Sequence, residues 1–143
     1  MGDLELAKRS LYDKQLTLVI VKNGQVLFET NSHRISGFVR AIDELGVQLK
    51  GASVADRVAG KALALLCVYA GITEVYAEVL SKKAKALFEE HKFAFEYKQL
   101  IDNVLDLNKN GVCPFEKAAA DISDPKNSYV AFKALLEKMK PCK

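Results

Sequence analysis

The sequence has few of the residues on which common metal and phosphate sites depend. Its 143 residues include three cysteines and two histidines. The cysteines, Cys67, Cys113 and Cys142, are odd in number and far apart, which argues against a disulfide framework. There is no Cys-x-x-Cys motif, and His33 and His91 form no paired spacing, so no zinc site is predicted. A glycine-rich phosphate loop is also missing, because "NGQ" and "AGKA" lack the required spacing.

The sequence also lacks an excess of either charge and a long apolar run. Its 21 basic and 18 acidic side chains leave a net charge of +3, which gives no support for nucleic-acid binding. The apolar stretch 62–73 is too short to span a bilayer, so no membrane partner is predicted. The first residues, "MGDLELAKRS", are charged and do not form a signal peptide. We therefore expect a cytoplasmic protein.

The N-terminal part of the chain predicts a helix followed by a β-hairpin. A short amphipathic helix around residues 4–11 precedes the β-branched run "LTLVIV" at 16–21. A second apolar run follows at 25–29, and Asn-Gly between two such runs is the strongest short hairpin signal. Residues 36–46 then predict a helix that ends at Gly46.

The middle of the chain predicts a long buried helix and then a strand. Ser53 and Asp56 have the spacing of a capping box, so we expect a helix over 54–70 that ends before Gly71. A strand is predicted over 73–80. Ser81 then has the position of an N-cap for the next helix, which carries several lysines.

The C-terminal part predicts one further strand and two helices. The strand is expected at 93–97, and 98–110 shows no clear pattern. Pro114 favours a helix that begins there and runs to about residue 122. Asp124 and Pro125 favour the start of a last helix. Its apolar face is expected at Val130, Ala131, Ala134, Leu135 and Met139.

Strands that alternate with helices after an opening hairpin indicate a layered α/β domain with mixed strand directions. The whole chain, 1–143, is expected to form this one domain. The order of elements resembles the cytidine-deaminase-like fold. That resemblance implies a three-layer α/β structure, with a mixed sheet opened by an antiparallel hairpin and helices on both faces.

The zinc ligands of the deaminase-like fold have no counterpart in this chain. Those enzymes carry His-x-Glu or Cys-x-Glu at one helix start and Pro-Cys-x-x-Cys at the next. The helix starts expected to correspond read "VADRVAG" and "VLSKKAK", without histidine or cysteine. We therefore predict no metal and no cofactor.

Three short motifs occur in an order that resembles a bacterial and archaeal family of unknown function. They are "ADRVAGKALALL", "YAEVLSKKA" and "GVCPFEKA", after the hairpin "LVIVKNGQVLFET". The resemblance covers about residues 16–138. It implies a deaminase-like fold without zinc ligands, together with the position of a site, and it implies no particular reaction.

Two candidate ligand-binding residues have structural alternatives. Lys61 is the only charged residue between Arg57 and Glu74. Its side chain either extends to the surface along its own stem or faces a cleft, and the adjacent Gly60 favours close packing against the sheet or a ligand. Ser81 is an N-cap by pattern, and the same helix start could also hold an anion.

The candidate catalytic residues are Asp56, Cys113 and Glu116. Asp56 is either a capping carboxylate or a charge that faces a pocket, and both interpretations stay open. Cys113 precedes Pro114 at a helix start, where cysteine is a poor cap and the helix dipole favours the thiolate. Glu116 could reach back to the Cys113 N–H group. Cys67 is expected to be buried, and Cys142 to be exposed.

These residues suggest a metal-independent protein of deaminase-like fold that binds a small, nucleotide-like ligand. If it is an enzyme, Cys113 would be the nucleophile or a redox thiol, and Glu116 or Asp56 the proton-transfer group. The alternative is a non-catalytic regulatory or scaffold module derived from that fold. A third hypothesis is assembly into a homo-oligomer through an exposed strand or helix.

Overall fold

The computed structural model describes residues 2–32, 35–105 and 111–139, so His33 and Cys142 lie outside the described residues. The strands are β1 (Leu18–Lys22), β2 (Gln25–Thr30), β3 (Ser53–Ala59), β4 (Glu74–Ser81) and β5 (Ala94–Ile101). The helices are α1 (Asp3–Asp13), α2 (Ser36–Leu45), α3 (Lys61–Ala70), α4 (Lys82–Glu90), α5 (Pro114–Ala119) and α6 (Pro125–Met139), with a short 3₁₀ turn at Gly46–Leu49.

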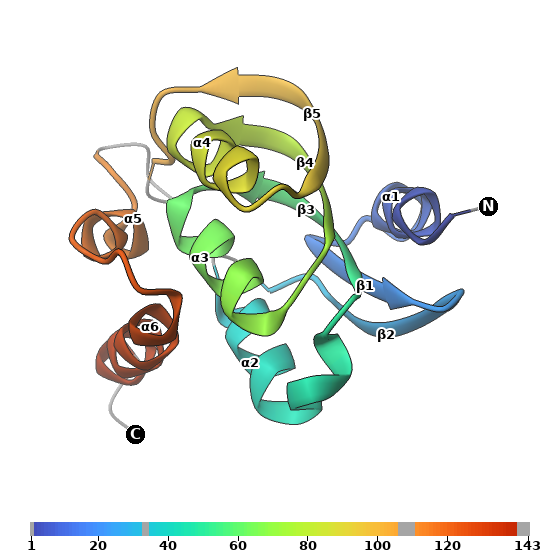
Figure 1. Cartoon of the computed structure of the whole chain (residues 1–143), viewed down its shortest axis with the longest axis horizontal. Helices are drawn as coiled ribbons and strands as arrows, with labels where there is room; N and C mark the ends of the chain where they lie inside the picture. The colour runs from blue at the N-terminus through green and yellow to red at the C-terminus, as the bar shows by residue number, and fades with distance from the viewer. Residues whose placement is uncertain (1, 33–34, 106–110, 140–143) are drawn as a thin grey trace.

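The strands form one mixed sheet in the order β2-β1-β3-β4-β5. Strand β1 is antiparallel to β2 and β3, whereas β3, β4 and β5 are parallel to one another. Helix α1 covers one face, and α2, α3 and α4 lie on the other, with α5 and α6 packed outside α3 (Figure 1). The predicted fold class is confirmed, including the opening hairpin and the helices on both faces.

The opening hairpin forms as its sequence predicts. Asn23 and Gly24 both have positive φ angles, of 53° and 76°, which a two-residue turn between twisted strands requires. The carboxylate of Asp3, at the start of α1, accepts hydrogen bonds from both of their N–H groups at 2.9 Å. This contact fixes the turn against the first helix.

The helix predicted over 54–70 is wrong in its first part. Residues Ser53–Ala59 form the central strand β3, which is hydrogen-bonded to β1 on one side and to β4 on the other. The Ser53 hydroxyl donates to Glu74 Oε1 at 2.6 Å instead of capping a helix. A strand buried on both faces reads as a continuous apolar run, so the run hides the change from strand to helix at Gly60.

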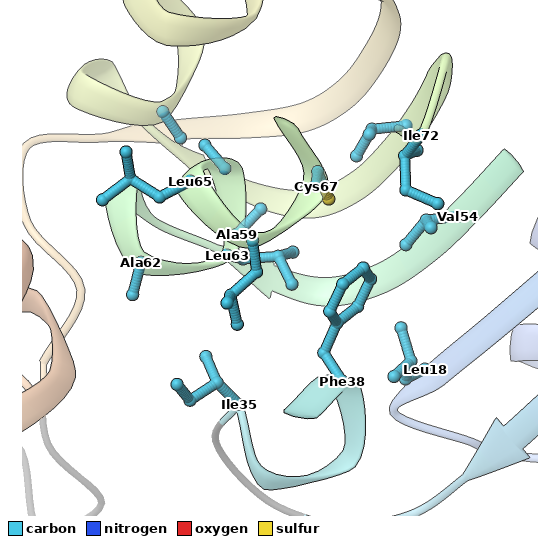
Figure 2. Close-up of a cluster of buried hydrophobic side chains, with 14 of the residues drawn as sticks. Leu18, Ile35, Phe38, Val54, Ala59, Ala62, Leu63, Leu65, Cys67 and Ile72 are labelled. Carbon is cyan, nitrogen blue, oxygen red and sulfur yellow. The ribbon is translucent and has the colours of Figure 1, made fainter. Parts of the chain in front are cut away.

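The main core lies between the sheet and helices α2, α3 and α4. Figure 2 shows Phe38 of α2 among Leu18, Val54 and Leu63, which come from β1, β3 and α3. Cys67 belongs to the same cluster and is fully buried, as predicted. The expected burial of Leu63, Leu65 and Leu66 is confirmed for the helical part of the run, 61–70.

The later elements follow the prediction with local differences. Strand β5 continues to Ile101, and α5 ends at Ala119. The Asp124 carboxylate accepts the Lys126 N–H group at 3.0 Å, as expected for a cap. The predicted apolar face of α6 is wrong for Val130, Ala134 and Met139, which are exposed, because the helix buries Ser128 and Phe132 instead. No helix within the described residues is long and apolar enough to cross a membrane.

Candidate functional site

A cavity of about 610 Å³ opens at the carboxyl ends of the parallel strands. This edge is where open α/β sheets generally bind ligands. Three of the five predicted site residues, Asp56, Cys113 and Glu116, line it together. They come from β3, from the segment before α5 and from α5, so only the tertiary fold brings them to one place.

Asp56 lies on β3 and is not a helix cap. It shares the face of the sheet that packs against α3, because it lies two residues after the core residue Val54. Its side chain is half-buried and lines the cavity. Beyond its immediate contacts, the carboxyl group is enclosed by packed protein atoms. Burial raises the pKa of its carboxyl to about 8, although hydrogen bonds from the backbone of Val58 and Arg57 offset part of the effect. Asp56 is therefore largely protonated at neutral pH.

Glu116 closes another wall of the cavity and caps helix α3. Its carboxylate oxygens accept the Lys61 N–H group at 2.9 Å and the Ala62 N–H group at 2.8 Å. These two N–H groups lie in the first turn of α3, where they have no acceptor within the helix. The helix dipole also favours a negative charge at this end. Burial nevertheless raises the pKa of Glu116 above its ordinary value. The predicted reach of Glu116 back to the Cys113 N–H group is wrong, since that group donates to the Val104 carbonyl.

Gly60 is required by this contact and not by its backbone angles. A Cβ atom at residue 60 would lie 2.5 Å from the Glu116 carboxylate. Its φ of −110° is accessible to any residue, so the constraint is space alone. The close approach expected at Gly60 therefore occurs, and the group that approaches is a side chain of the same protein.

Cys113 precedes α5 and lines the cavity, with 8% of its surface exposed. Its side chain makes no capping hydrogen bond, whereas its carbonyl accepts the N–H groups of Glu116 and Lys117. The predicted helix start is confirmed. Little of Cys113 is therefore open to bulk solvent.

Lys61 and Ser81 are not part of the cavity lining. The half-buried Lys61 extends along α5, and its Nζ donates to the Ala120 carbonyl at 3.4 Å, at the end of that helix. Ser81 is 1% exposed and caps α4, accepting the Ala84 N–H group at 3.1 Å. The contacts of both residues match the structural alternatives given for them: Lys61 extends along its own stem, and Ser81 is an N-cap.

Sequence reasoning missed several residues of the cavity wall. Gln99 and Asn103 bring amide groups from the end of β5 and the segment after it, and Phe115 contributes an aromatic wall. No local motif marks these residues. Arg57 also borders the cavity, but its guanidinium is directed to Glu78 at 2.8 Å and to the Leu16 carbonyl at 2.9 Å.

Of the two helix starts expected to correspond to the deaminase zinc motifs, "VADRVAG" is not a helix start, because it lies in strand β3 and ends at Gly60 before α3. The other, "VLSKKAK", contains the start of α4 as expected. Among residues 2–32, 35–105 and 111–139, no cluster of three histidine, cysteine or acidic side chains could hold a metal ion.

The fold and the site define an α/β protein with a mixed sheet, whose cavity is lined by Asp56, Cys113 and Glu116. The family model of a domain of unknown function, DUF1893, matches residues 6–136. The chain belongs to this family.

The solved structures that resemble the chain include another member of the family. That DUF1893 protein, from Thermotoga maritima, has a TM-score of 0.83 and 27% identity over 92% of this chain and 88% of its own. A dCMP deaminase from the cyanophage S-TIM5 has a TM-score of 0.48 and 11% identity over 69% of this chain and 94% of its own. A diaminohydroxyphosphoribosylaminopyrimidine deaminase/reductase from Thermotoga maritima has a TM-score of 0.47 and 20% identity over 81% of this chain and 38% of its own. No curated protein matches the chain.

Proposed function

We propose that the cavity binds a small heterocyclic ligand of the nucleoside or nucleotide class without the help of a metal ion. The convergence of Asp56, Cys113 and Glu116 on one cavity is the observation that carries this proposal. A volume of about 610 Å³ lies within the range of about 300–1,000 Å³ that is usual for small-molecule sites.

The protonated state of Asp56 favours a neutral ring over a phosphate beside its carboxyl group. A carboxylic acid presents one hydroxyl donor beside one carbonyl acceptor. This pair complements a ring edge that has an acceptor next to a donor, as nucleobases do. The guanidinium of Arg57 is directed away towards Glu78, so it does not favour an anion there.

Proton transfer is the chemistry that this arrangement fits. Asp56, with a pKa of about 8, can give and take a proton near neutral pH. Glu116 would be the second carboxyl group, and Cys113 the nucleophile or redox-active thiol that faces the ligand. Lys61 and Ser81 would act indirectly, through the helix ends that they hold.

A ligand screen by thermal shift tests the proposal. A panel of free nucleosides and their 5′-monophosphates is added to the wild-type chain, to Asp56→Ala and to Asp13→Ala, whose exposed carboxyl lies on α1. Alanine at residue 56 removes both the donor and the acceptor, whereas asparagine would keep such a pair. A specific ligand at a hundred times its Kd stabilises the native state by about 2.7 kcal/mol. We expect a shift in the wild type and in Asp13→Ala that Asp56→Ala loses. The proposal fails if no compound shifts the transition, or if Asp56→Ala responds like the wild type.

A non-catalytic module is the second candidate, and one observation favours it. Glu116 and Ser81 cap helices α3 and α4, so both residues have a structural function without any ligand. In that case substitutions at Asp56 and Cys113 would leave the binding of a protein partner unchanged, and no compound of the panel would bind.

A further inference from the structure

Strand β5 is an exposed edge of the sheet. It is the last strand in the sheet order, and Figure 1 shows no described helix or strand beyond it. Six of its eight residues are exposed, among them Tyr97 at 39% and Leu100 at 36%. An edge strand carries a row of backbone N–H and C=O groups that can pair with another strand.

The two edges of the sheet differ in how well they could accept a partner strand. Strand β2 is paired to β1 with a register shift at Ile20/Val21, and such irregularities discourage edge pairing. Strand β5 keeps one register against β4 from Ala94 to Ile101 and contains no proline. It therefore presents a long, regular edge.

The side chains of β5 are self-complementary about Tyr97. In an antiparallel pair of two β5 strands with Tyr97 on the twofold axis, residue 96 of each lies opposite residue 98 of the other. These residues are Glu96 and Lys98, so the pairing places opposite charges together twice. The two Tyr97 rings would meet on the other face, where Tyr97 already stacks on Phe95 with a centroid distance of 6.4 Å.

The intramolecular contacts of Glu96 and Lys98 are compatible with this pairing. Glu96 accepts from Lys8 through Oε1 at 3.2 Å, and its second carboxylate oxygen can accept from a further lysine. The Lys98 ammonium lies 5.6 Å from the Tyr12 ring centroid, on the α1 side of the sheet. Both charges lie on that side because they alternate with Tyr97.

We propose that two copies of this chain associate through antiparallel pairing of their β5 strands, with Glu96 of each copy opposite Lys98 of the other. The result is one continuous ten-stranded sheet with twofold symmetry. This inference concerns assembly and is independent of the ligand proposed for the cavity.

Exchanging the charges of Glu96 and Lys98 tests the pairing. Association is measured by sedimentation equilibrium at protein concentrations from about 1 to 300 μM, the range suited to a small interface. Each single variant, Glu96→Lys or Lys98→Glu, places like charges opposite each other twice. We expect each to weaken dimerisation by at least about tenfold. An equimolar mixture of the two variants restores both opposite-charge pairs, so it should dimerise within about threefold of the wild type.

The mixture separates lost pairing from lost folding, because two misfolded chains would not rescue each other. Lys98→Glu in addition leaves the Lys8–Glu96 ion pair intact. Glu29→Lys is the matched control, since Glu29 is an exposed residue of the other edge strand and is paired with Lys14. A wild-type chain that stays monomeric over the whole range overturns the proposal. So does a dimer that is insensitive to Glu96→Lys, or a mixture that does not reassociate.

Discussion

Replacing Asp56 by asparagine should stabilise the protein, and the gain should grow with pH. The folded protein holds the pKa of Asp56 at about 8, against an ordinary value of 3.8 in the unfolded chain. Between these values the unfolded chain releases a proton that the folded protein keeps, so stability falls as pH rises. Below about pH 4 the cost is absent, and above about pH 8 it is constant.

The size of the effect follows from the pKa difference. Each unit corresponds to about 1.4 kcal/mol, so the 3.2 units between 3.8 and pH 7 correspond to roughly 4 kcal/mol. The carboxyl is half-buried and borders the cavity, so exposure to solvent would offset part of this cost, and we expect a gain between about 1 and 4 kcal/mol at pH 7. Asparagine keeps the size of the side chain and the oxygen that accepts the Val58 N–H group at 3.2 Å.

The assay is urea unfolding of the wild type and Asp56→Asn at pH 5, 7 and 9. The difference between the two proteins isolates Asp56, because the other titrating groups are common to both. Asp102→Asn is the control. Asp102 is exposed, and Lys82 holds its pKa below the ordinary value, so its difference from the wild type should not change above pH 5. A constant difference between Asp56→Asn and the wild type from pH 5 to 9 would refute the reasoning, since it would mean that Asp56 is ionised in the folded protein.

Three further predictions concern the cavity wall, its thiol and the missing metal. Gly60→Ala should lower the free energy of unfolding by about 1–3 kcal/mol, because its Cβ atom displaces Glu116 from the start of α3. In a Glu116→Ala background the loss should be much smaller, and a double-mutant cycle by urea unfolding measures the difference. Losses that simply add would contradict the contact. In a Cys142→Ser background, Cys113 should react faster with iodoacetamide than Cys67, whose pKa is raised by burial; equal rates, followed by peptide mass spectrometry, would place Cys113 outside the accessible wall. Purified protein should contain no stoichiometric zinc, because the expected ligands are missing; elemental analysis that finds one zinc per chain would reverse that expectation.

The sequence alone was sufficient wherever a few neighbouring residues decide the backbone. The Asn23–Gly24 hairpin, the Ser81 cap and the helix start at Pro114 are all present as predicted. Each depends on local chemistry, namely a tolerated positive φ, a side-chain acceptor for a free N–H group, or a fixed proline angle. The order of such signals was also enough to indicate the mixed α/β sheet.

The sequence misled where pairing across the sheet decided the outcome. Ser53 and Asp56 have capping-box spacing, yet hydrogen bonds from β1 and β4 on both sides make residues 53–59 a strand. A local cap stabilises by about 1 kcal/mol, whereas two ladders and the burial of the apolar strand residues contribute several times more.

Only the tertiary structure could decide which candidate residues meet. Asp56, Cys113 and Glu116 are separated by up to 60 positions in the chain (from 56 to 116), and the cavity joins them because the carboxyl ends of β3, β4 and β5 meet α5. The same packing removes Lys61 and Ser81 from the site and turns Arg57 to the opposite face. It also sets the protonation of Asp56, because desolvation depends on all the atoms packed around a carboxyl and not on its neighbours in sequence.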